Sequence, residues 1–291
     1  MENVTINSED IDSLWDTVIS PKKSYLHLNV REIWRYRDLL MLFVKKDIIT
    51  VYKQTILGPI WFLMQPVFTT LIYMLIFGKM GGMADKTVPS ILFFMGSVTL
   101  WNYFSDTLNV TSRTFSDNAS VFGKVYFPRI ILPISKVISG LIKFFIQFGL
   151  FIMIWIYFLV VKAKTPINPN INILLFPLFI CILSGLSLGF GLFITSLTNK
   201  YRDLIFLVSF GVQLMMFATP VLYPISKYPR YQFGLFLNPL TSVFEGFKYA
   251  FLGSGVLDFR WLLYSSVFTL IVLISGIFMF NKVERKFIDT V

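Results

Sequence analysis

Charged residues make up only 14% of this 291-residue chain, and cysteine and histidine occur once each, as Cys181 and His27. A single cysteine excludes an intramolecular disulfide framework. A single histidine leaves little for metal binding or acid–base chemistry. The sequence also lacks the pattern G-x-x-x-x-G-K-S/T, so it contains no phosphate-binding loop of that type. A soluble domain usually has about 25% charged residues, and this shortage excludes a disordered chain and an ordinary cytosolic enzyme.

Apolar residues are abundant instead, at 55% of the chain, and the mean hydropathy is +0.69. The chain contains several long stretches with few or no charges, and a membrane-spanning helix needs about 20 mainly apolar residues. Backbone polar groups in hydrocarbon must be satisfied within the segment, so each stretch is predicted to be helical. The sequence therefore predicts an all-α integral membrane protein with six transmembrane helices. The predicted spans are residues 59–79, 88–110, 134–161, 171–198, 204–224 and 261–281.

The distribution of Lys and Arg predicts the orientation of these spans. Placing both termini in the cytoplasm puts the larger share of the basic residues on the inner side, as membrane proteins prefer. We attribute the net charge of +10 to these loops and not to nucleic-acid binding. Residues 1–20 are acidic, without Lys or Arg, and show no secretory signal pattern. Residues 1–30 are therefore predicted to be a mobile cytoplasmic tail.

Residues 31–58 are predicted to form an amphipathic helix followed by a loop at the cytoplasmic entrance. Ile33, Leu40 and Val44 share one face of this helix, and most of its charged residues lie on the opposite face. A basic amphipathic helix that leads into a span is expected to lie in the headgroup plane. A solvated helix beside the membrane is the alternative. Glycine and proline redirect the chain in the entrance loop, which consists of Leu57, Gly58 and Pro59.

Several short motifs resemble those of a known family. They are R-D-L-L at 37–40, K-D-I at 46–48, Y-K-Q-T-I-L-G-P-I-W at 52–61, W-N-Y-F at 101–104, G-K-V-Y-F-P-R at 123–129, Y-R-D at 201–203, T-P-V-L-Y-P at 219–224 and N-P-L at 238–240. In this order, over about residues 26–291, they resemble the permease subunit of ABC-2 type exporters, in the branch that exports lipid-linked O-antigen and related polysaccharides. Phe247-Lys248-Tyr249 departs from the family, whose members often carry an arginine in this part.

The resemblance implies an ABC-2 fold of the type V exporter kind that functions as a dimer in the bacterial inner membrane. Two partner ATPase subunits would bind ATP and magnesium, while this chain would bind no cofactor and would not itself be an enzyme. The implied cargo is undecaprenyl-diphosphate-linked polysaccharide of the O-antigen type. Teichoic acid, capsular polysaccharide, a lipid or a drug are alternative cargoes. An integral-membrane enzyme acting on a lipid-linked substrate is the alternative from another class, and it would need a catalytic cluster at membrane depth.

The predicted cytoplasmic segment 111–133 combines aromatic and basic residues. Aromatic anchors with a cationic rim suit a protein–protein contact, and in the family this segment resembles the coupling region that receives the ATPase. An ordinary positively charged loop is the alternative. The candidate docking residues, with the aromatic side chains expected to be exposed, are Asn118, Phe122, Lys124, Tyr126, Phe127, Pro128 and Arg129.

Two spans carry stripes of aromatic and amide side chains at helical spacing. Aromatic rings stack on the C–H faces of sugars and amides hydrogen-bond to hydroxyls, so the stripes are candidate walls of a translocation pathway. Packing against lipid and neighbouring helices is the alternative. The stripes are Trp61, Gln65 and Phe68 in the first span, and Phe206, Phe210, Gln213 and Phe217 in the fifth.

Lys136 and Lys143 lie seven residues apart, on one side of the third span. An ammonium group at membrane depth usually faces protein, water or an anion. Lys143 is a candidate for contact with the diphosphate of the carrier lipid. Snorkelling of the lysines to the inner interface is the interpretation we favour.

Two further patterns predict packing. Gly185 and Gly189 form a G-x-x-x-G motif, which permits close approach of two helices and is expected to act within one subunit. The external loop, residues 225–260, is apolar enough to dip back towards the membrane in two short helices. Within it, Glu245 and Lys248 are three residues apart and are expected to pair.

Overall fold

The computed structural model describes residues 30–53, 60–83, 87–118, 127–161, 167–198, 201 and 203–288. Within these ranges the regular structure is helical and no strand occurs, so the predicted all-α class is confirmed. Residues 1–29 of the predicted tail lie outside the described residues. So do the entrance-loop residues Leu57, Gly58 and Pro59, and Phe122, Lys124 and Tyr126 of the predicted docking segment.

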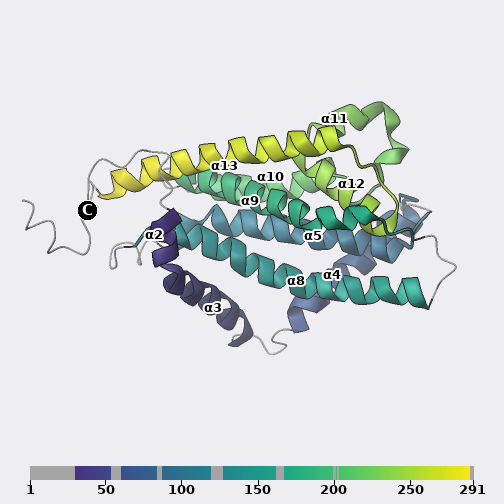
Figure 1. The fold of residues 1–291 in the computed structure, drawn as a ribbon, viewed down its shortest axis with the longest axis horizontal. Helices are drawn as coiled ribbons and strands as arrows, with labels where there is room; N and C mark the ends of the chain where they lie inside the picture. The colour runs from purple at the N-terminus through teal and green to yellow at the C-terminus, as the bar shows by residue number, and fades with distance from the viewer. Residues whose placement is uncertain are drawn as a thin grey trace, which may run out of the picture.

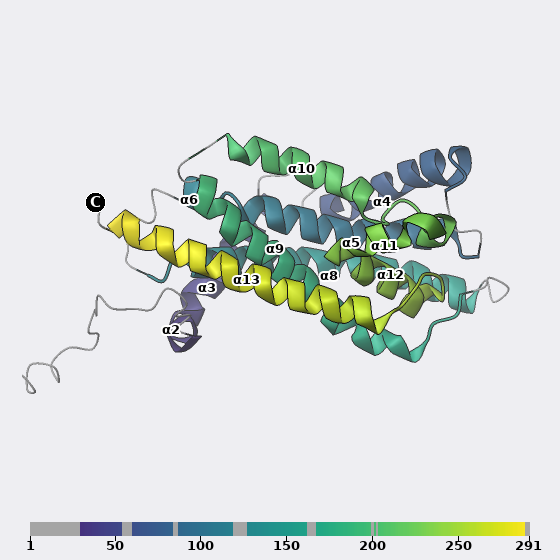
Figure 2. The same ribbon diagram turned by 90° about the horizontal axis from the view of Figure 1, so that it is seen from above.

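Long helices run side by side along the long axis of the molecule (Figure 1, Figure 2). They are α5 (Ser90–Thr111), α8 (Ile131–Val160), α9 (Phe176–Thr198), α10 (Leu204–Ala218) and α13 (Phe259–Ile288). An inclined helix, α4 (Ile60–Tyr73), continues as the π-helix η1 (Met74–Met80). Helix α5 lies in the middle, where it packs against α4, α8 and α9.

Four helical segments are long and apolar enough to cross a membrane: Ile60–Met80, Ile131–Val160, Ile171–Thr198 and Phe259–Glu284. The third begins with the 3-10 helix η2 (Ile171–Leu175). The two other predicted spans coincide with α5 and α10, which do not meet the same measure of length and hydropathy. Helix α5 carries polar residues and is mostly buried between other helices, so it does not need a fully apolar surface. The count of six crossings stays a prediction.

Helix α10 ends at Ala218, well before the predicted end of that span at residue 224. Thr219 is extended, with φ −107° and ψ 142°, because the ring of Pro220 disfavours a helical conformation in the residue before it. The helix therefore ends before residue 224, and the predicted bounds of the crossing, 204–224, stay a prediction.

The segment 225–260 folds back against the bundle. It holds the 3-10 helices η3 (Ile225–Lys227) and η4 (Pro229–Tyr231), then α11 (Gln232–Phe236) and α12 (Pro239–Leu252). Helix α12 is almost entirely buried and contacts α5, α9 and α13. Its Glu245 Oε1 and Lys248 Nζ lie 3.0 Å apart with both side chains buried, so the predicted pair is confirmed.

Helices α9 and α13 pack closely against each other. A Cβ atom on Gly185 would lie 2.5 Å from Thr269 Cγ2, and one on Gly189 would lie 2.9 Å from the backbone nitrogen of Leu273. The G-x-x-x-G motif therefore packs within the chain, as predicted.

At the other end of the molecule, α2 (Val30–Arg35) and α3 (Arg37–Lys53) lie on the side of the bundle, with α3 along α8 (Figure 1). Leu40 and Val44 of the predicted apolar face are buried against α8. Part of that face is thus covered by protein, while Trp34 and Leu42 remain exposed. The location of α3 in the headgroup plane stays a prediction.

Candidate functional site

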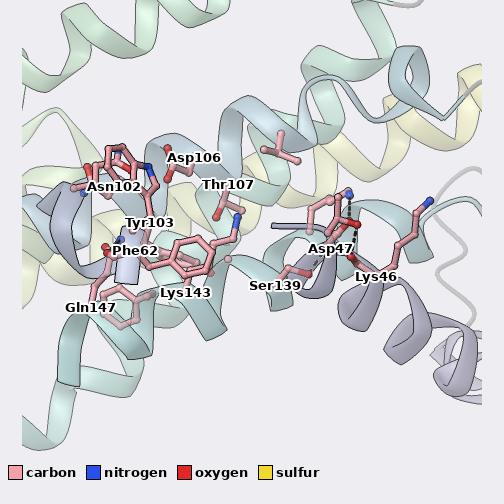
Figure 3. A pocket seen from close by; sticks show the side chains of 17 residues that line it. Lys46, Asp47, Phe62, Asn102, Tyr103, Asp106, Thr107, Ser139, Lys143 and Gln147 are labelled. Atoms are coloured by element: carbon pink, nitrogen blue, oxygen red, sulfur yellow. Dashed lines mark hydrogen bonds and ion pairs between the residues drawn. The ribbon is translucent and has the colours of Figure 1, made fainter. Parts of the chain in front are cut away.

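Polar residues from four helices meet in a cavity of about 420 Å³ between α3, α4, α5 and α8 (Figure 3). Three lysines and two aspartates line it, namely Lys46, Lys136, Lys143, Asp47 and Asp106. Ionisable groups within a membrane bundle are costly, and they usually mark a substrate or ion pathway. We therefore take this cavity as the candidate site.

Helix α8 contributes one polar face to the cavity. Lys136, Ser139, Gly140, Lys143 and Gln147 recur at helical spacing and all line it. Buried Gln147 donates from Nε2 to the carbonyl oxygen of Phe62 at 3.2 Å. This bond fastens the start of α4 to α8 and closes one end of the cavity.

Helix α3 is fastened to α8 at the opposite end. Lys136 Nζ lies 2.6 Å from Asp47 Oδ1, and each side chain is about one-fifth exposed. Ser139 donates from Oγ to the second carboxylate oxygen, Oδ2, at 3.3 Å. Lys46 also lines the cavity, but its side chain extends away from Asp47 (Figure 3).

Lys143 lies between these two ends (Figure 3). Its ammonium nitrogen is 5.5 Å from the centre of the Phe62 ring, a distance at which a cation is attracted to an aromatic face. Among the described residues no carboxylate lies within ion-pair distance of this nitrogen, and Asp106 of α5 is its acidic neighbour. Lys143 thus faces an internal cavity together with Trp61 and Gln65 of the predicted pathway.

Helix α5 forms the far wall with Asn102, Tyr103, Asp106 and Thr107. The hydroxyl groups of Tyr103 and Ser184 hydrogen-bond at 2.6 Å, which ties this wall to α9. The Thr107 hydroxyl is buried and has no hydrogen-bond partner in the described part of the chain.

The structure does not bring the two predicted stripes into one cavity. Phe68 is 51% exposed on α4 and does not line the site. On α10, Phe206, Phe210 and Gln213 are exposed. Phe217 borders a separate aromatic cavity of about 420 Å³ near η3, η4 and α11, which is lined by Phe77, Met83, Phe217, Leu222, Tyr223, Tyr228, Tyr231 and Leu235. The role of the stripes in translocation stays a prediction.

The described part of the docking segment packs against the bundle. Asn118 Nδ2 donates to the Thr114 carbonyl at 3.0 Å at the end of α6 (Thr114–Asp117). The backbone nitrogen of Arg129, which follows Pro128, donates to Glu284 Oε1 of α13 at 3.4 Å. The expected exposure of Phe127 is wrong: its side chain is 5% exposed and its ring centre lies 5.8 Å from that of Phe43. An aromatic ring beside the apolar face of α3 is more stable buried there than in water.

Sequence reasoning missed several residues of the cavity. Asp47, Asp106, Thr107, Ser139 and Gln147 were not predicted as site residues. One signal was available, because the spacing of Lys136, Ser139, Lys143 and Gln147 puts a polar stripe on one face of a span.

Known proteins resemble this chain over most of its length. The family model for the ABC-2 type transporter matches residues 38–252. The O-antigen export system permease protein RfbA of Myxococcus xanthus is 27% identical over 266 residues, which are 90% of this chain and 98% of that protein. A protein of the same name from Klebsiella pneumoniae is 27% identical over 254 residues, 87% of this chain and 94% of that protein. Another from Klebsiella pneumoniae is 26% identical over 253 residues.

Proposed function

This chain belongs to the ABC-2 type transporter family, and from that premise we propose that it is the permease subunit of an ATP-driven exporter of undecaprenyl-diphosphate-linked polysaccharide of the O-antigen type. It is a multi-pass membrane protein of a permease family. The observation that carries the proposed cargo is the similarity, over about nine-tenths of the chain, to proteins named O-antigen export system permease.

The proposed direction of transport is from the cytoplasmic to the outer side of the bacterial inner membrane. The excess of Lys and Arg in the segments assigned to the cytoplasm supports this orientation, with both termini inside. The end of the molecule that holds α2, α3 and α6 would face the cytoplasm (Figure 2). The end that holds α11 and α12 would face outwards.

The proposed transporter contains two copies of this chain and two ATPase subunits. The absence of the G-x-x-x-x-G-K-S/T pattern from the sequence supports a separate motor. The segment 111–133 and α3 would receive it, since Phe127 joins that segment to α3. The exposed aromatic side chains of α4 and α10 would face the second copy and the path between the two bundles.

The polar cavity supports a cargo that carries a negatively charged headgroup. Lys143 is the proposed contact for the diphosphate of the carrier lipid, because its ammonium group faces the cavity and, although Asp106 attracts it, forms no direct ion pair with a described residue. Trp61 and Gln65 beside it offer an aromatic ring and an amide for the first sugar.

Deletion of the gene tests this function. We expect lipid-linked glycan to accumulate in the cytoplasmic leaflet and to disappear from the cell surface, and the wild-type chain to restore both. Mass spectrometry of extracted lipid-linked glycans identifies the cargo. Accumulation of a teichoic acid or capsular precursor would contradict the O-antigen assignment, and unchanged surface glycan would contradict polysaccharide export altogether.

Purification tests the proposed partners. The affinity-tagged chain is expected to bring down a nucleotide-binding subunit in equal ratio, and ATP hydrolysis should depend on that subunit. Hydrolysis by the purified chain alone would contradict the division between permease and motor.

A further inference from the structure

The Thr107 hydroxyl lacks a partner although its side chain is only 2% exposed. A Cβ atom on Gly140 would lie 2.6 Å from Thr107 Oγ1, so this hydroxyl reaches α8 at a position where no side chain intervenes. A buried hydroxyl without a hydrogen bond is unfavourable. This oxygen is covered by Gly140, but Thr107 lines the cavity, so a change of its side-chain rotamer would turn the unsatisfied donor towards a ligand oxygen there.

Two ammonium groups flank this hydroxyl along α8. Lys136 precedes Gly140 by four residues and Lys143 follows it by three, and all of them line the same cavity. The two lysines are about 10.5 Å apart along the helix axis at 1.5 Å per residue, and their long side chains can approach each other. The order cation, hydroxyl, cation suits a ligand with two linked anionic groups, which a diphosphate provides.

One of these two ammonium groups, that of Lys136, already forms an ion pair with Asp47. This ion pair joins α3 to α8 next to the apolar contacts of Leu40 and Val44. A phosphate that enters the cavity must compete with this carboxylate for Lys136. Asp106, the second acid of the lining, attracts Lys143 without forming a direct ion pair, so a phosphate must compete with this carboxylate as well. Lys46 gives the lining three basic groups against two acidic ones.

We infer that this cavity binds the diphosphate ester headgroup of a lipid, with Lys143 and Thr107 holding the headgroup while Lys136 exchanges Asp47 for it and so releases α3 from α8. The inference rests on the proposed function for the lipid-linked nature of the cargo. It adds a specific consequence, because α3 packs against Phe127 of the segment proposed to receive the ATPase. Occupancy of the site would thus change the surface that meets the motor.

The test uses the full-length chain in nanodiscs of neutral phosphatidylcholine, with farnesyl diphosphate as the probe. Binding is followed by tryptophan fluorescence, since Trp61 lines the cavity. Inorganic diphosphate and farnesol serve as separate arms for the headgroup and the chain. Farnesyl diphosphate is expected to bind at least about tenfold more tightly than either, because charge and apolar burial both contribute.

Two variants break the same ion pair and are expected to act in opposite directions. Lys136→Gln removes a phosphate ligand and should weaken binding about tenfold, whereas Asp47→Asn removes the competing acid and should strengthen it several-fold. Lys136→Arg should restore binding. Thr107→Val should weaken it by about tenfold or more, the loss of one hydrogen bond to a charged group. The matched controls are exposed residues of α3 outside the cavity, Lys45→Gln and Asp38→Asn.

Movement of α3 is measured separately with spin labels at Leu42→Cys and Phe145→Cys in a Cys181→Ser background, since both labelled positions are exposed. Farnesyl diphosphate should lengthen the distance between the labels in the wild-type background. Asp47→Asn should lengthen it without ligand. An unchanged distance in both cases would overturn the release of α3.

Equal effects of Lys136→Gln and Asp47→Asn on affinity would overturn the inference, because they would make the pair purely structural. Inorganic diphosphate binding as tightly as farnesyl diphosphate would overturn the lipid assignment in favour of a free anion. These outcomes are distinguishable from failure of the proposed function. If the expected order of affinities appears while deletion leaves surface glycan unchanged, the site stands and its lipid carries a different cargo.

Discussion

The close contact between α9 and α13 depends on the absence of a side chain at Gly189. At Gly189, a Cβ atom would lie 2.9 Å from the backbone nitrogen of Leu273, and a helix backbone cannot move aside as the end of a side chain can. Gly189→Ala is therefore expected to lower the free energy of unfolding by about 1–3 kcal/mol, the usual cost of overpacking. Thermal unfolding of the purified chain in detergent measures this loss.

Gly149→Ala is the matched control, because no atom lies within 4 Å of a Cβ at that helical position. Alanine is favoured over glycine in a helix by about 0.5–1 kcal/mol, so this variant should be as stable as the wild type or slightly more so. Equal losses of stability in the two variants would contradict the close contact between α9 and α13.

The buried ion pair of α12, Glu245 with Lys248, affects stability in a different way. Stability is lost when one of the two charges is removed without the other. Glu245 Oε2 also accepts from the backbone nitrogen of Val256 at 3.2 Å, and Lys248 also donates to the carbonyl oxygen of Pro220. Glu245→Leu would remove the carboxylate that balances a buried ammonium, and we expect a loss of about 3–5 kcal/mol.

The double variant Glu245→Leu/Lys248→Leu should lose less stability than the sum of the two single variants, as measured by the same thermal unfolding. Additive losses would show that the two charges do not stabilise each other.

Among the helices, α10 is well suited to a test of transport without loss of stability, because its aromatic side chains are exposed. Phe206 and Phe210 are 79% and 61% exposed, and Phe217 is 59% exposed. Replacing all three with leucine should leave the unfolding temperature nearly unchanged. If these rings stack on sugars, the variant should reduce glycan export by about threefold to tenfold, as expected for lost aromatic contacts.

Surface glycan in the complemented deletion strain, normalised to the amount of protein, measures this effect. Phe145→Leu on α8 is the control, since this ring is 53% exposed and belongs to neither stripe. Wild-type export by the triple variant would remove α10 from the translocation path.

The positions of the helices were largely predictable, whereas the contacts between them were not. Apolar stretches bounded by charges located α8, α9 and α13, because lipid-compatible helices need length and apolarity that are visible locally. The end of α10 at Ala218 was not predicted, although Pro220 disfavours a helical conformation in the residue before it. Asp47 and Lys136 are 89 residues apart in sequence, and they meet only because α3 packs on α8. No local pattern encodes that meeting.

The same limit explains the error at Phe127. Its neighbourhood in sequence is basic and contains glycine and proline, which is typical of an exposed loop. Its neighbourhood in space is the apolar side of α3 and the start of α8. The candidate site was likewise predicted only in part. Trp61, Gln65 and Lys143 were predicted separately, and the packing of four helices brings them together with residues to which the sequence analysis gave no role.

For the molecule as a whole, the predicted crossings place its two ends on opposite sides of a membrane. Helices α6 and α11 lie near opposite ends of the bundle (Figure 2). Ser116 is exposed on α6, and Arg230 is exposed on η4, which contacts α11. The distribution of Lys and Arg assigns the first to the cytoplasm and the second to the outside. Ser116→Cys and Arg230→Cys, each in a Cys181→Ser background that removes the native thiol, test the two ends separately.

A membrane-impermeant maleimide should label Arg230→Cys in intact cells and Ser116→Cys only after permeabilisation. The Cys181→Ser chain without a new cysteine controls for background labelling. Labelling with the two sides reversed would contradict the orientation while preserving the crossing, and it would place the lysine-lined cavity out of reach of a lipid-linked cargo made in the cytoplasm. Three predicted spans, an odd number, lie between the two positions, so they should face opposite sides of the membrane. Labelling of both positions from outside would therefore contradict the predicted crossings.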